Sequence, residues 1–142
     1  MNYKKYQYLI GIDTGVNTGY CQYDTVSKKI ITLKTLQIHR AMSNVIELNK
    51  SYKNNIYIRV EDARLRTWFG KSGREQLQGA GSIKRDAKIW EDFLTDLKIP
   101  FELVAPKNNK TKINAEIFKN IFGWNDKCSE HARDACMLVF GF

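Results

Sequence analysis

The stretch LIGIDTGVNTGY, from Leu9 to Tyr20, decides the fold. It begins with an apolar run that ends in one acid, Asp13, and continues through two glycines, Gly15 and Gly19. A short apolar run bounded by glycine-containing turn signals is typical of a buried β-strand, and the residues after Gly19 again favour a strand. The stretch therefore predicts a strand that ends in an acid, a tight turn shaped by glycine, and a second strand.

The rest of the chain extends this start into a meander and then alternates helices with strands. Residues 6–13, 18–23 and 29–37 are rich in β-branched and aromatic residues and are separated by short polar turns. The later elements expected from periodicity are a helix over 40–53, a strand over 56–61, a helix over 74–97, a strand over 101–104, and helices over 112–122 and 129–140. This order predicts an α/β fold with a five-stranded mixed sheet flanked by helices, in a single domain over residues 1–142.

Composition narrows the class of protein. The chain has 142 residues, 43% of them hydrophobic and 27% charged, as is usual for a globular domain. No apolar run is long enough for a membrane span or a signal segment, so we expect a cytoplasmic protein without a membrane partner. The net charge of +8 favours a polyanionic partner, because Lys and Arg that neutralise phosphates release condensed counterions. The three cysteines have the spacing of neither a disulfide framework nor a zinc site.

Acidic residues follow two strands that we expect to be neighbours. A strand that pairs in parallel with the first arrives only after a crossover, so 56–61 should lie beside the first strand. Asp13 and Glu61 then meet at the sheet edge where open α/β sheets bind ligands. Adjacent side chains on a strand point to opposite faces, so only one of Glu61 and Asp62 can share a face with Asp13, and we expect Glu61. His131 and Asp134 are three residues apart and share one face of the last helix.

Three carboxylates and an imidazole at one edge favour bound cations, because the acids would otherwise repel one another. The predicted ligands of two divalent ions, Mg²⁺ or Mn²⁺, are Asp13, Glu61, His131 and Asp134. Two such ions can activate water and stabilise the leaving oxygen of a phosphodiester. His131 favours Mn²⁺, or acts instead on a water or a phosphate. Singly, each residue also fits a turn, cap or core role, so the hypothesis depends on their joint placement.

Two basic segments add candidates for contact with phosphate. RLRTWFGKSGR, residues 64–74, interleaves cations with two aromatics, which suits stacking on unpaired bases, although Trp68 or Phe69 could equally anchor the loop to the core. The loop of residues 105–111 is also basic, and its cations could hold a scissile phosphate, although Lys110 could equally be solvated. The candidate DNA-binding residues are Arg64, Arg66, Trp68, Phe69, Lys71, Arg74, Lys84, Arg85 and Lys110.

Five segments, in order along the chain, resemble the RuvC-like Holliday junction resolvases of the ribonuclease H-like nuclease superfamily. They are LIGIDTGVNTGY, IRVEDA, GREQLQGAGSIKRDAKIWEDFL, VAPKNNKTKINAEIFKNIFG and HARDACMLVFG. The resemblance implies a ribonuclease H-like fold and a homodimer whose two sites nick opposed strands of a four-way junction. It also implies metal binding and catalysis by Asp13, Glu61, His131 and Asp134, and it favours Lys107 and Lys112 as catalytic cations. A wide apolar stripe on the long helix, including Ile89, Phe93 and Leu97, fits a dimer.

Other interpretations use parts of the same pattern. Asp13-Thr14-Gly15 is the aspartic protease tripeptide, but those proteases need a mainly β fold and a second facing aspartate. Actin-like ATPases share an acid in the first turn but need two such domains, so we expect no nucleotide cofactor. An RNA-processing ribonuclease H-like nuclease and a non-catalytic junction-binding module remain alternatives. The favoured prediction is a metal-dependent endonuclease for branched DNA, a crossover junction endodeoxyribonuclease.

Overall fold

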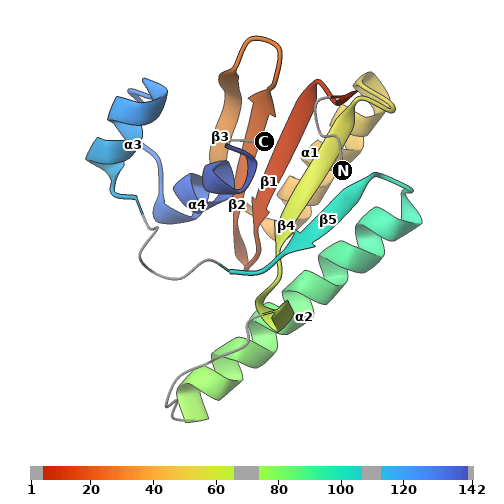
Figure 1. The fold of residues 1–142 in the computed structure, drawn as a ribbon. Helices are drawn as coiled ribbons and strands as arrows, with labels where there is room; N and C mark the ends of the chain where they lie inside the picture. Colours follow the sequence, from red (N-terminus) through yellow and green to blue (C-terminus); the bar gives the residue numbers. More distant parts are fainter. Residues whose placement is uncertain (1–4, 66–73, 107–112, 141–142) are drawn as a thin grey trace.

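The computed structural model describes residues 5–65, 74–106 and 113–140, and for residues 74–80 and 83 the backbone alone. The strands are β1 (Tyr8–Asp13), β2 (Asn17–Asp24), β3 (Lys29–Gln37), β4 (Ile56–Glu61) and β5 (Phe101–Val104). The helices are α1 (Ile38–Ser51), α2 (Arg74–Asp96), α3 (Ala115–Phe122) and α4 (Glu130–Val139), with a short 3-10 turn at Ala63–Leu65. Figure 1 shows how they are arranged.

The five strands form one mixed sheet in the order β3-β2-β1-β4-β5. The pairs β1–β2 and β2–β3 are antiparallel, whereas β1–β4 and β4–β5 are parallel. In the central parallel pair, Tyr8 lies opposite Ile56 and Ile12 lies opposite Val60. The predicted α/β class, the mixed sheet and the pairing of β1 with β4 are therefore confirmed.

Helices cover both faces of this sheet, and strand alternation divides the core in two. One cluster joins Ile10, Ile12, Ile58 and Val60 to apolar residues of α1 and α2. The other joins the intervening strand positions, such as Leu9 and Tyr57, to α4 and α3. In the central strands, even-numbered side chains thus face α1 and α2, and odd-numbered ones face α4.

Helix α4 packs closely on the sheet because two strand positions lack a side chain. A Cβ on Gly11 would overlap the carbonyl of Ala135, and a Cβ on Gly19 would overlap the carbonyl of His131. The sequence suggested that Gly19 shapes the turn after Asp13, but it lies within β2 under α4. It is Gly15, with a φ of 155°, that takes the unusual backbone conformation in that turn.

Helix boundaries differ from the prediction where a capping residue sets the start. Helix α3 begins at Ala115 because the Asn114 side chain accepts the N–H of Ile117, 2.9 Å away. Ser129 similarly caps α4 through the N–H of Ala132, 3.1 Å away. Among the described residues, the helices are all too short or too polar to cross a membrane.

Candidate functional site

The centre of the candidate site is a contact between Asp13 and His131. Asp13 is the last residue of β1 and is only 7% exposed, and His131 lies in the first turn of α4 with half of its side chain exposed. Nδ1 of His131 lies 3.0 Å from Oδ2 of Asp13, which is hydrogen-bond distance. Two of the predicted site residues, 118 positions apart in the sequence, therefore meet directly.

Glu61 ends β4 at the level where Asp13 ends β1, since Ile12 and Val60 are partners one position earlier. The hydroxyl of Thr14 donates to the carbonyl of Glu61 over 3.2 Å and ties the two strand ends together. This register brings the first two predicted acids to the same edge of the sheet.

Strand alternation fixes the face on which Glu61 lies. Two positions before it, Arg59 donates from Nη1 to the carbonyl of Leu138 on α4. The next position, Val60, packs in the core cluster that includes residues of α2. Glu61 therefore lies on the face of the sheet that carries α4, as does Asp13, and Asp62 lies on the opposite face.

Asp134 completes the predicted set from α4. It is half-buried and follows His131 by three residues, so the two share one side of the helix. Within residues 5–65, 74–106 and 113–140, no group of three or more His, Cys, Asp or Glu side chains is arranged to hold a metal ion. The donor types suit a divalent metal, but their side chains do not form a coordination shell.

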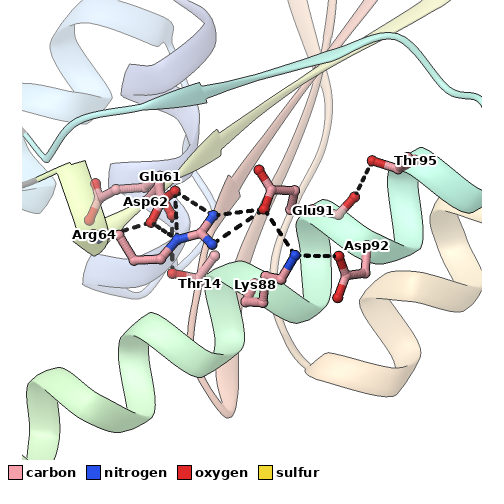
Figure 2. Close-up of polar contacts among 8 residues, drawn as sticks. All are labelled: Thr14, Glu61, Asp62, Arg64, Lys88, Glu91, Asp92 and Thr95. Atoms are coloured by element: carbon pink, nitrogen blue, oxygen red, sulfur yellow. Dashed lines mark hydrogen bonds and ion pairs between the residues drawn. The ribbon is translucent and has the colours of Figure 1, made fainter.

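Arg64 has a structural environment that the sequence did not predict. Its Nε and Nη2 atoms lie 2.9 Å and 2.7 Å from the carboxylate oxygens of Asp62, and its Nη1 and Nη2 atoms lie 3.3 Å from Oε1 of Glu91 on α2 (Figure 2). We interpreted Arg64 as a DNA-binding residue, whereas in the structure two carboxylates engage its guanidinium. The sequence signal that could have indicated this is the Asp-Ala-Arg spacing directly after a strand.

Burial and ion pairing shift the pKa of the Asp62 carboxyl in opposite directions. Its side chain is 1% exposed, and burial alone would raise the pKa of its carboxyl. The side-chain and backbone hydrogen bonds from Arg64, together with its charge, outweigh burial and lower the pKa of Asp62. The same pairing raises the pKa of Arg64. Both groups are therefore held in their charged forms.

The remaining predicted residues divide by how far the structure describes them. Lys84 is half-buried on α2, and the neighbouring Arg85 is exposed, with Nε 3.8 Å from Oδ1 of Asp86. Arg74 is the first residue of α2, and only its backbone is described. The residues that lie outside the described part of the chain are Arg66, Trp68, Phe69, Lys71, Lys107, Lys110 and Lys112.

Comparison with known proteins finds similarity in structure but not in sequence. No protein-family model and no curated protein matches the chain. Its structure is similar to that of the Fowlpox virus resolvase, which was solved in complex with its substrate Holliday junction DNA. The two chains are 13% identical, with a TM-score of 0.44 over 91% of this chain and 95% of the other. The strand order and the helices on both faces of the sheet agree with the predicted ribonuclease H-like fold.

Proposed function

We propose that this protein is a metal-dependent endonuclease that cuts branched DNA, with four-way junctions as its substrate. The observation that carries the proposal is the contact between Asp13 and His131 at the carboxyl end of β1. Glu61 lies on the same face of the sheet as Asp13, and Asp134 lies on α4, the helix packed against that face. A buried carboxylate beside an imidazole, with two further acids close in the fold, is a donor set suited to phosphodiester hydrolysis.

The residues proposed to hold two Mg²⁺ or Mn²⁺ ions are Asp13, Glu61, His131 and Asp134. When bound by these residues, such ions would activate a water and stabilise the leaving oxygen of the cut strand. Carboxylate oxygens suit Mg²⁺, whereas the imidazole favours Mn²⁺. Because these side chains do not already form a coordination shell, we expect the ion to assemble the site on binding.

Charge supports a nucleic-acid substrate. The chain carries a net charge of +8, and its basic segments at 64–74 and 105–111 begin shortly after the ends of β4 and β5. Both strands run parallel to β1, so these segments leave the sheet at the same edge as Asp13. We propose that the cations of these segments that follow Arg64, together with Lys112, bind the DNA backbone close to the acids, with Lys107 and Lys112 beside the scissile phosphate.

The test compares four substrates under single-turnover conditions. Purified protein is incubated with a four-way junction, a linear duplex of the same sequence, a three-way branch and a structured RNA, each in Mg²⁺, in Mn²⁺ and in EDTA. We expect cleavage of the junction in either metal, no cleavage in EDTA, and little cleavage of the linear duplex.

Three other results would each overturn a different part of this proposal. Preferential cleavage of the RNA would make this an RNA-processing nuclease and would overturn the choice of substrate. A junction that is bound but stays intact in both metals would overturn the proposed catalysis and identify a junction-binding module. Cleavage that persists in EDTA would contradict metal dependence.

A further inference from the structure

Asp62 is a buried acid that the proposed catalysis does not use. It follows Glu61 directly, but it lies on the face of the sheet that carries α2, away from Asp13. Its side chain is 1% exposed, and an isolated charge at such a position would be costly. The charge is balanced by the half-buried Arg64, so the structure retains an ion pair with a buried carboxylate immediately beside the candidate site.

This ion pair connects three parts of the chain: the end of β4, the 3-10 turn and α2. Asp62 accepts the backbone N–H of Arg64 over 2.9 Å, in addition to the guanidinium. The guanidinium also contacts Glu91, in the C-terminal part of α2, and Lys88 Nζ lies 3.6 Å from the same Glu91 oxygen (Figure 2). The end of β4, the 3-10 turn and α2 are thus linked by one guanidinium.

The backbone around Asp62 is fixed from both sides. Its N–H donates to the carbonyl of Val104 over 2.8 Å and continues the β4–β5 pairing by one residue. Its own carbonyl accepts the N–H of Leu65 over 3.1 Å, which closes the 3-10 turn. Glu61 stands directly before this turn, so its position depends on the same contacts.

The geometry also indicates whether the Arg64 guanidinium is available to bind DNA. A guanidinium has five donors, and Arg64 directs its Nε, Nη1 and Nη2 atoms at carboxylates of its own chain. Moving it to a phosphate would leave Asp62 as a buried charge without its cation, which is strongly unfavourable. Arg64 is therefore better suited to hold the strand end than to bind DNA.

We propose that Asp62 and Arg64 are positioning residues, which fasten the end of β4 to α2 through Glu91 and thereby hold Glu61 beside Asp13. Their effect on cleavage rests on the proposed nuclease function, whereas their effect on the strand end does not. The pair acts as a clamp behind the site: it touches neither the reacting phosphate nor the proposed ions.

The first experiment measures cleavage and binding of a four-way junction by Asp62→Asn, Arg64→Ala and the double variant. We expect each single variant to cut the bound junction about tenfold to a hundredfold more slowly, because small misplacements of a catalytic group have effects of this size. The double variant should be no slower than the slower single one, since either change opens the same clamp. Lys53→Ala, which removes one exposed cation in the turn between α1 and β4, should cut at the wild-type rate.

The salt dependence of junction binding distinguishes a positioning role of Arg64 from a direct contact between Arg64 and DNA. If Arg64 is a positioning residue, the slope of log Kd against log salt stays the same in Arg64→Ala as in Lys53→Ala. If Arg64 binds a phosphate, Arg64→Ala lowers that slope by about one. Asp62→Asn would then free the guanidinium, tighten binding and leave cleavage intact, and this result would overturn the proposal.

Amide hydrogen exchange tests the clamp without any cleavage. We expect the amides of Asp62 and Leu65 to exchange faster in Arg64→Ala than in the wild type, while the amide of Ile58 keeps its protection. Unchanged exchange at Asp62 and Leu65 would overturn the proposal even if the variant cuts slowly. A wild-type protein that cuts no DNA would instead overturn the proposed function, and exchange would still decide the clamp.

Discussion

Glu61 and Asp62 are adjacent acids with opposite environments, because side chains alternate along β4. Glu61 lies on the face of α4 and Asp13, whereas Asp62 is buried toward α2 and paired with Arg64. The sequence predicts that only one of them joins Asp13, since alternation is a property of any strand. The Asp-Ala-Arg spacing allows Arg64 as the partner of Asp62, but it does not select this role, because Arg64 also suits a basic loop that contacts DNA.

The lowered pKa of Asp62 predicts how stability depends on pH. A carboxyl whose pKa is lower in the folded than in the unfolded protein stabilises the fold above the unfolded value, about 3.9, and this contribution is lost as pH falls through the folded pKa. We therefore expect the free energy of unfolding to fall more steeply below about pH 4 in the wild type than in Asp62→Asn. Urea denaturation across pH 2.5 to 6, taken here as a practical range around that value, measures both slopes. Parallel curves for the two proteins would contradict the assignment.

At the scale of elements, the seating of α4 on the sheet decides whether His131 reaches Asp13. The helix backbone approaches β1 at Gly11 and β2 at Gly19 so closely that neither position has room for a Cβ. We expect Gly19→Ala to lower the free energy of unfolding by about 1–3 kcal/mol, because the helix must move away from the strand. The proposed cleavage should slow as well, since the helix carries His131.

Gly81 provides the matched control on α2. A Cβ at this helical position meets nothing within 4 Å, so Gly81→Ala should raise the free energy of unfolding by about 0.5–1 kcal/mol. Thermal or urea unfolding of Gly19→Ala and Gly81→Ala measures whether the free energy of unfolding falls in the first variant and rises in the second. Equal stability of Gly19→Ala and the wild type would mean that α4 does not pack on β2 as described.

The elements themselves were largely predictable, whereas their side-chain contacts were not. Alternating and helical periodicity predicts β1, β4 and α4, and the crossover rule predicts that β1 and β4 are parallel neighbours. The contact of Arg64 with Glu91 spans 27 residues and depends on the rotation of α2 about its axis. Packing of Trp90 and Leu94 sets that rotation, and no local pattern in the sequence reports it.

At the scale of the whole molecule, exposed apolar residues on α2 and directly after it fit the homodimer expected from the sequence. Ile89 on α2 is 42% exposed, and Leu97, directly after the end of this helix, is 37% exposed. We expect the double variant Ile89→Glu and Leu97→Glu to be monomeric by sedimentation while the wild type is a dimer. It should nick only one strand of a junction per binding event.

Helix α3 offers a control of the same chemistry. Ile117 and Ile121 are similarly exposed, at 47% and 48%, and their double change to Glu should leave the dimer intact. A wild-type protein that sediments as a monomer at micromolar concentration would contradict the proposed dimer. Loss of the dimer in both double variants would place the interface elsewhere than α2 alone.

The central claim is that Asp13 belongs to a metal-dependent nuclease site, and the cleavage of a labelled four-way junction by three proteins in Mn²⁺ tests it most directly. Asp24→Asn changes an acid at the end of the neighbouring strand β2 and serves as the control. We predict that the wild type and Asp24→Asn cut opposed strands at symmetric positions, while Asp13→Asn binds the junction and leaves it intact. Cleavage by Asp13→Asn at the wild-type rate would contradict the account.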